Sequence, residues 1–215
     1  MKTFTFYLMR HAVTDFINGE PAVVGSTDLP LSAEGAEAAK NASVILNEAI
    51  NPQAVFCSPL LRAKQTARLL FREKEILVAE GIKEYCFGDL EGTTFKEIFN
   101  GGEFDWAELF KRINSAGGAE VPKEFLTRIC ASFAKIIESC IKSEINSAAI
   151  ISHGFAMMHL MSIFTYPKLD NIYEWSCENL AGFVLKTDTA LWMRDHALET
   201  KGVILNGVVD MFDTI

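Results

Sequence analysis

Three segments of this sequence carry side chains suited to chemistry on an anion. They are Arg10-His11, the segment from Ser58 to Arg62, and Ser152-His153-Gly154. If folding gathers these segments, two arginines and two histidines repel one another unless an anion lies between them. The guanidinium fork of arginine matches the oxygens of a phosphate in a bidentate way. We therefore expect a phosphate group to bind at this site.

The elements that must position these segments are three short strands. Residues 3–9, 54–57 and 148–151 are alternating or apolar stretches typical of strands, and each ends directly before one of the segments. In open α/β sheets ligands bind outside the carboxyl ends of the strands, so the segments should line one crevice. Ser58 is expected to cap a helix with Pro59 at its first position, and the dipole of that helix would favour an anion there.

The rest of the chain continues this alternation of strands and helices. Ser32 is a suitable N-cap for a helix over 32–49, and further helices are expected from Pro122 onward and over 155–164. The helix that begins at Pro122 has an apolar stripe with the spacing of a core-facing side, formed by Phe125, Ile129, Phe133, Ile136, Ile137 and Cys140. Further strands are expected over 76–79, 180–185 and 202–209. The pattern predicts a three-layer α/β/α sandwich with a mostly parallel sheet.

The segment 92–121 departs from this alternation and is expected to be irregular. Gly101-Gly102 and Gly117-Gly118 bracket an aromatic stretch within it. We predict a single domain over residues 1–215, in which 92–121 is a lid or insertion that shapes the substrate pocket. The aromatic residues of this segment could equally belong to the core; they are Phe95, Phe99, Phe104, Trp106 and Phe110.

The composition limits the class of protein and of partner. The chain has 215 residues, 49% of them hydrophobic, with 20 Lys+Arg against 28 Asp+Glu and thus a net charge of −8. This hydrophobic content excludes a disordered chain. An acidic chain is a poor partner for nucleic acid or an anionic membrane, because both need a basic face. It can still bind a small anion, since a few convergent cations focus positive potential in one crevice.

The cysteines and the apolar stretches indicate a cytoplasmic protein. The five cysteines are scattered and include no C-x-x-C pair, so free thiols are expected, and neither a disulfide framework nor a zinc knuckle. The stretch 3–9 is short and runs straight into Arg10-His11, as a first strand does and a signal peptide does not. Residues 148–166 contain no Asp, Glu, Lys or Arg, but Ser152-His153-Gly154 interrupts them, which favours a strand, a turn and a helix over a membrane span.

A series of motifs in this chain resembles the histidine phosphatase superfamily, which has the phosphoglycerate mutase-like fold. Leu8 to Thr14 is similar to the family signature L-x-R-H-G-x-T, with Ala12 in the place of the glycine. The other motifs follow in family order: Gly25 to Gly35, Ser58 to Ala67, Glu84 to Gly92, Gly117 to Glu120 with Arg128, Ser152 to Gly154, and Glu178-Asn179. The resemblance is to the branch that holds alpha-ribazole phosphatases and phosphoglycerate mutases.

The resemblance implies catalytic roles for five residues and phosphate contacts for three more. His11 would be the nucleophile that forms a phosphohistidine, a step that splits one hard displacement into two easier ones. Arg10, Arg62 and His153 would hold the transferring oxygens, and the arginines would lower the pKa of His11. Glu84 would be the general acid and then the general base. Thr14 and Gly25 would contact the phosphate, and Ser58 could be an N-cap, a phosphate ligand or both.

Each of these residues also has a structural interpretation. His11 and His153 could be buried packing residues, Arg62 a surface charge on a helix, and Glu84 a partner in a salt bridge. His159, in the middle of an apolar helix, is expected to be structural, and His196 to lie on the surface.

The resemblance implies a metal-independent phosphomonoesterase that acts on a small phosphorylated metabolite, with no cofactor, because fixed cations replace a metal ion. The alternatives are a mutase of the phosphoglycerate type and a non-catalytic protein that binds a phosphorylated ligand. Asn18 stands one residue later than the asparagine of the mutases, with Ile17 in the matching position. A homodimer is possible.

Departures from the family pattern point to an apolar pocket beyond the phosphate. Phe155 replaces a glycine, and Met157-Met158 replace a position that is often polar or basic. The basic pair with which mutases bind a second acid group is not recognisable. Lys96, Lys111 and Arg112, in the segment 92–121, are candidates for it.

Overall fold

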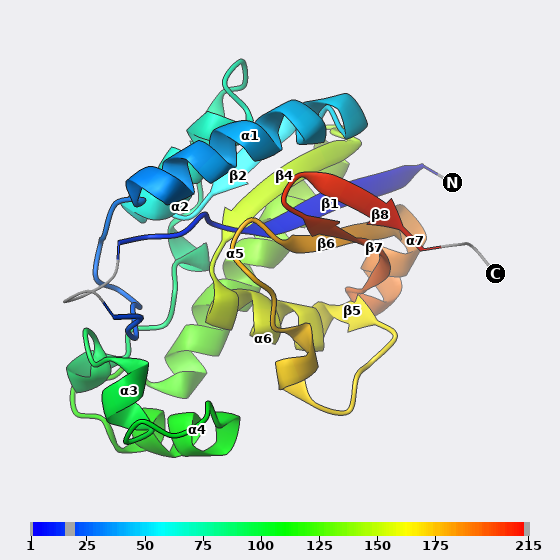
Figure 1. Cartoon of the computed structure of the whole chain (residues 1–215). Coiled ribbons are helices and arrows are strands. Elements are labelled where there is room, and N and C mark those ends of the chain that lie inside the picture. The colour runs from blue at the N-terminus through cyan, green and yellow to red at the C-terminus, as the bar shows by residue number, and fades with distance from the viewer. Residues whose placement is uncertain (1, 16–19, 213–215) are drawn as a thin grey trace.

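A mixed sheet divides the computed structural model, which describes residues 2–15 and 20–212, into two layers of helices (Figure 1). The strand order is β3-β2-β4-β1-β6-β7-β5, and β8 pairs with β7. Strands β3, β2, β4 and β1 are parallel neighbours, whereas β6 pairs with β1 in the antiparallel direction. The strands are β1 Thr3–Arg10, β2 Ala54–Cys57, β3 Ile76–Val78, β4 Ser147–Ser152, β5 Thr165–Tyr166, β6 Gly182–Asp188, β7 Leu198–Leu205 and β8 Val208–Met211.

Both faces of the sheet are buried, which confirms the predicted three-layer sandwich. Along β1 the side chains alternate: Phe4, Phe6 and Leu8 enter one core and Met9 enters the other. Helices α1 (Ala33–Ala49) and α2 (Leu61–Leu70) cover the face of Met9, and α5 (Pro122–Lys142) and α6 (Gly154–Phe164) cover the opposite face (Figure 1). The burial of each large apolar side chain contributes roughly 1.5–3 kcal/mol to this arrangement.

Two of the helix predictions hold in detail. The hydroxyl of Ser32 accepts a hydrogen bond from the N–H of Gly35 and so caps α1, as its position predicts. Helix α5 begins at Pro122 and buries the whole of the predicted apolar stripe, which consists of Phe125, Ile129, Phe133, Ile136, Ile137 and Cys140.

The prediction that Ser58 caps a helix is wrong. Helix α2 begins at Leu61, its N-cap is Leu60, and no side-chain hydroxyl caps it. The carboxylate of Asp28 instead accepts a hydrogen bond from the Leu61 N–H at 2.5 Å. A residue distant in sequence therefore satisfies the helix end, and Ser58 is free to contact another partner.

The prediction of one strand over 202–209 is also wrong. Strand β7 ends at Leu205, and β8 returns beside it from Val208. Asn206 and Gly207 both have positive φ, 48° and 89°, which is the geometry of a tight hairpin turn. The dipeptide Asn-Gly is the sequence signal for that turn.

The segment 92–121 contains two helices and is not irregular as predicted. Helix α3 (Phe95–Ile98) begins with a capping box in which Thr94 and Glu97 satisfy each other's backbone N–H groups. Helix α4 (Trp106–Ser115) is capped by Asp105, whose carboxylate accepts from the Ala107 N–H. Both helices lie together below the carboxyl end of the sheet, away from the two termini (Figure 1).

The remaining elements are short. They are η1 (Glu80–Ile82), η2 (Gly88–Leu90), η3 (Ile172–Trp175) and α7 (Thr189–Asp195). Among the described residues no helix combines the length and the apolar character that crossing a membrane requires.

Candidate functional site

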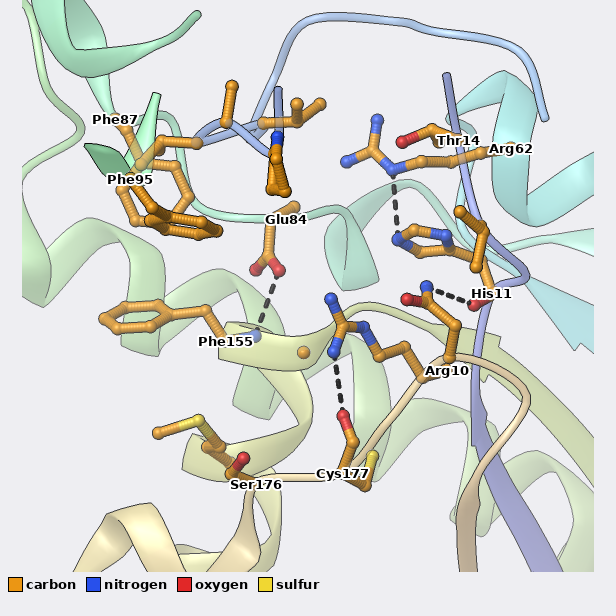
Figure 2. Close-up of a pocket in the computed structure, with 18 of the residues that line it drawn as sticks. Arg10, His11, Thr14, Arg62, Glu84, Phe87, Phe95, Phe155, Ser176 and Cys177 are labelled. Atoms are coloured by element: carbon orange, nitrogen blue, oxygen red, sulfur yellow. Dashed lines mark hydrogen bonds between the residues drawn. The ribbon is translucent and has the colours of Figure 1, made fainter. Parts of the chain in front are cut away.

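The three charged segments meet at the carboxyl edge of the sheet. Strands β2, β4 and β1 are adjacent and parallel, and their register places Arg10 beside Ser152 and Cys57 beside Ile151. The residues that follow these strand ends must therefore lie close together. The ring centroids of His11 and His153 are 5.0 Å apart, and Figure 2 shows Arg10, His11, Arg62 and Glu84 pointing into a shared space.

The hydrogen bonds of His11 define which of its nitrogens is available. Its Nδ1 lies 2.7 Å from the carbonyl oxygen of Ala12 and must donate to it, because a carbonyl can only accept. Nε2 then carries the ring's in-plane lone pair, which accepts from the Nε of Arg62 at 3.2 Å. Burial, and after it the charges of Arg62 and Arg10, hold the pKa of His11 well below its usual range. The ring is therefore neutral near pH 7.

Arg62 is buried, so the interpretation as a surface charge does not hold. Only 1% of this residue is exposed. Besides contacting His11, its guanidinium donates to the carbonyl oxygens of Gly25 at 2.7 Å and Thr27 at 2.9 Å. The loop from Gly25 to Thr27 thus fixes the plane of the guanidinium.

The carboxylate of Glu91, to which the sequence analysis assigned no role, holds this loop in place. Glu91 accepts hydrogen bonds from the backbone N–H and the hydroxyl of both Ser26 and Thr27, and from the N–H of Phe87. Gly25 lies against the backbone of Tyr85, where a Cβ would come within 2.1 Å of the carbonyl oxygen. The only sequence signal for Glu91 was its place within the Glu84 to Gly92 motif.

Arg10, which lines the cavity, and His153, which is fully buried next to His11 and does not line it, carry further polar atoms. Arg10 donates from Nη1 to the carbonyl of Cys177 at 2.8 Å, and His153 Nε2 lies 2.7 Å from the hydroxyl of Ser58. Arg10 Nε and His153 Nδ1 are buried and have no hydrogen-bond partner among the described residues. Burial first, and then the charges of His11, Arg62 and Arg10, lower the pKa of His153. Buried polar atoms of this kind normally have a partner, and the oxygens of a phosphate suit them.

Glu84 follows η1, and its carboxylate lies at the N-terminus of α6, where it lines the cavity. One carboxylate oxygen accepts from the N–H groups of Tyr85 at 3.0 Å and Ala156 at 2.9 Å, and the other accepts from Phe155 at 3.0 Å. It forms no ion pair with a described residue, so the salt-bridge interpretation finds no support. Burial raises the pKa of Glu84, although these hydrogen bonds and the charge of Arg62 oppose the shift. The group is thus suited to carry a proton.

Arg128 on α5 holds the backbone of Glu84 and of the residues before it. Arg128 donates to the carbonyl oxygens of Gly81, Lys83 and Glu84 at 2.7–2.9 Å. It also forms two 2.6 Å hydrogen bonds with Glu120. The sequence showed this pair as part of a motif but not what it holds, because the acceptors are backbone carbonyls.

The three expected phosphate contacts occupy different places. Thr14 lines the cavity together with Arg10, His11, Arg62 and Glu84. Ser58 is fully buried behind His153, and Gly25 contributes its carbonyl to Arg62. Neither Ser58 nor Gly25 lines the cavity.

Two other histidines lie outside this region, as expected. His159 donates from Nδ1 to the carbonyl of Phe155 and packs edge-on against Phe125. His196 is exposed at the end of α7. Ile17 and Asn18 lie outside the described residues. Among the described residues no three His, Cys, Asp or Glu side chains are grouped so that they could hold a metal ion.

Comparison with known proteins decides the family. A profile of the histidine phosphatase superfamily (branch 1) matches residues 6–195, which contain all of the candidate site residues named above. The chain belongs to this superfamily. Membership places this histidine phosphatase among enzymes that hydrolyse or transfer phosphoryl groups.

Named relatives of this histidine phosphatase include both phosphatases and mutases. It is 33% identical over 87 residues to the adenosylcobalamin/alpha-ribazole phosphatase of Escherichia coli K12, a match that covers 40% of this chain and 42% of that protein. The alpha-ribazole phosphatase structure from Shigella flexneri has a TM-score of 0.73 at 19% identity and covers 98% of this chain and 100% of that one. A phosphoglycerate mutase from Bacillus anthracis has a TM-score of 0.72 at 22% identity, covering 99% and 93%. These structures show that the fold is shared.

Ala12, where the superfamily signature has glycine, fits without strain. The described non-glycine residues with positive φ do not include Ala12. It is fully buried, and its N–H donates to the hydroxyl of Thr66 at 3.0 Å. The backbone of this chain therefore does not need glycine after His11.

The lowered pKa values of His11 and His153 make the stability of this histidine phosphatase depend on pH. In an unfolded chain a histidine takes up a proton near pH 6.5, whereas these two stay neutral in the fold. Stability is therefore present above about pH 6.5 and is lost as the pH falls toward their folded pKa values, by about 1 kcal/mol per histidine for each pH unit. Urea unfolding at about pH 7.5 and about pH 5.5 measures this difference.

A variant isolates the contribution of one ring. His153→Gln removes the contribution of this one ring, so the pH-dependent loss should shrink by about a third, because His11 and His159, whose pKa burial also lowers, still contribute. The raised pKa of Glu84 acts with the opposite sign, but it is the same in both proteins. An unchanged pH dependence in the variant contradicts the prediction.

Proposed function

We propose that this chain is a metal-independent phosphomonoesterase that hydrolyses a small phosphorylated metabolite through a phosphohistidine at His11. The observation that carries the proposal is the tautomer of His11. Its Nδ1 donates to a backbone carbonyl, so the lone pair lies on Nε2, where it accepts from Arg62 until a phosphate takes the hydrogen bond of that arginine, and His11 lines the cavity beside Arg10 and Arg62. A neutral nucleophile held among cations is what attack on a phosphate dianion requires.

In the first step, His11 Nε2 attacks phosphorus and forms the N–P bond while the ester P–O bond breaks. Glu84, in its protonated form, gives its proton to the departing alkoxide. Arg10 and Arg62, with His153, hold the three transferring oxygens, and their preorganised charge stabilises the transition state.

In the second step, the carboxylate of Glu84 takes a proton from water as that water attacks phosphorus. The N–P bond breaks, inorganic phosphate leaves, and both residues return to their starting states. Asn179 supports the attacking residue, since its Nδ2 donates to the His11 carbonyl at 2.8 Å.

Hydrolysis is favoured over mutase transfer by the residues beyond the phosphate end. A mutase of the phosphoglycerate type must hold a second acid group with basic side chains. Lys96 pairs with Glu20, and Lys111 and Arg112 pair with Glu108. None of these three basic residues lines the cavity.

The two activities separate in one assay. We expect inorganic phosphate to be released from phosphomonoesters at a rate that is independent of any added bisphosphorylated primer. A coupled assay for 2-phosphoglycerate formed from 3-phosphoglycerate should give less than about a tenth of that rate, because Lys96, Lys111 and Arg112 do not line the cavity and cannot bind the carboxylate. Strict dependence on the primer with little phosphate release would establish a mutase, and binding without turnover would establish a non-catalytic protein.

A further inference from the structure

The cavity continues from Glu84 into a space with apolar walls. The cavity volume is about 550 Å³, which is in the range of pockets for small ligands. Figure 2 shows Phe87, Phe95 and Phe155 on the side of Glu84 away from His11. The apolar residues that line this part are Val23, Val24, Phe87, Phe95, Phe104, Trp106, Leu109, Phe155 and Met158.

The segment 92–121 supplies part of this apolar wall, and its aromatic rings pack against one another and against η3. Phe104 packs edge-on against Phe95 and against Trp106, with ring centroids 5.8 and 4.9 Å apart. Trp106 stacks on Tyr173 of η3 at 5.3 Å. These contacts between rings hold the wall in place before any ligand binds, which reduces the cost of binding.

Among the described residues that line the cavity, the charged groups are those of the phosphate end and Asp15. The cations among the described lining residues are Arg10 and Arg62, which lie beside the neutral ring of His11. The acidic lining residues are Glu84 and Asp15, so an acid group on the leaving group would meet repulsion from Asp15 and, among the described lining residues, no cation besides Arg10 and Arg62.

We propose that this wall is a subsite for an apolar, ring-bearing leaving group without a second acid group. This proposal rests on the proposed function, because the ring must be attached to the phosphate that His11 attacks. The substrates would then be phosphomonoesters of hydrophobic alcohols. Phe104 is the residue best placed to test the subsite, since it lines the cavity at its mouth and is 49% exposed.

Binding of phosphonates, which cannot be hydrolysed, tests the subsite without turnover. By titration calorimetry, 3-phenylpropylphosphonate should bind about ten-fold more tightly than 3-hydroxypropylphosphonate. The free energy gained when an aromatic ring is buried corresponds to at least this difference in affinity. The carboxylate-bearing 3-phosphonopropionate should bind more weakly than either. Phe104→Ala should abolish most of the preference for the phenyl compound and leave the affinity for the hydroxyl compound unchanged.

Phe212→Ala is the matched control, since Phe212 has the same 49% exposure and does not line the cavity. It should keep the full preference. Equal affinities for the phenyl and hydroxyl compounds, or an unchanged preference in Phe104→Ala, would overturn the subsite. A separate assay tests the proposed function: if it is wrong, the protein will not hydrolyse 4-nitrophenyl phosphate in a way that depends on His11.

Discussion

Replacing His11 with alanine should lower kcat for every phosphomonoester by about 10⁴-fold or more, because the covalent route disappears with the nucleophile. The arginines and His153 remain and would still bind the phosphate group. The variant should therefore retain its affinity for phosphonates while turnover is lost. Steady-state phosphate release and calorimetry on the same preparation measure both quantities.

The intermediate can also be observed directly. Wild-type protein quenched at alkaline pH during turnover should carry one added phosphoryl group on the peptide that contains His11, as mass spectrometry would show. His196→Ala is the control, since that histidine is exposed and outside the site. It should keep both the activity and the label. Substantial turnover by His11→Ala, or a label on another residue, would refute the nucleophile assignment.

Replacing Glu84 with glutamine should slow the hydrolysis of alkyl phosphates by about 10²- to 10⁴-fold, because an alkoxide must be protonated as it leaves. With 4-nitrophenyl phosphate the first step needs no acid, so it should stay fast. The second step still lacks its base. The variant should therefore release a burst of one nitrophenolate per active site and then turn over slowly, which stopped-flow absorbance measures.

The control must separate this role from a loss of structure. The Glu84 carboxylate accepts N–H groups at the start of α6, and the amide of glutamine reproduces only part of that set. The thermal unfolding of Glu84→Gln should therefore be measured together with its kinetics, so that a loss of structure can be distinguished from a loss of the proton donor. Glu80→Gln, at an exposed position four residues earlier, should change neither rate. Equal slowing of both substrate types, without a burst, would exclude the general acid role.

Much of the fold was predictable because its signals are local. The alternation along β1 and the stripe on α5 each report a face buried against the core, and Ser32 with Gly35 forms a cap within one turn. The helices of 92–121 were not predicted. Their caps at Thr94 and Asp105 are local too, but glycines and clustered aromatics around them masked the helical pattern.

The candidate site divides in the same way. Arg10, His11 and His153 could be predicted to meet because each directly follows a strand, and parallel neighbours end at one edge. The partners of those side chains could not be predicted. Ser58 was expected to cap a helix, yet its hydroxyl contacts His153, which is 95 residues away in the chain.

The sequence by itself determined the strand ends, the residue types gathered there and the family that uses them. Only the tertiary structure decided the tautomer of His11, the loop that Glu91 holds against Arg62 and the support that Arg128 gives to Glu84. The physical reason is that the hydrogen bonds of Arg62 and Arg128 join distant segments, and that the acceptors, including the Ala12 carbonyl next to His11, are backbone carbonyls, which every residue has. Side-chain identity fixes what a group can donate or accept, whereas packing fixes which partner it meets.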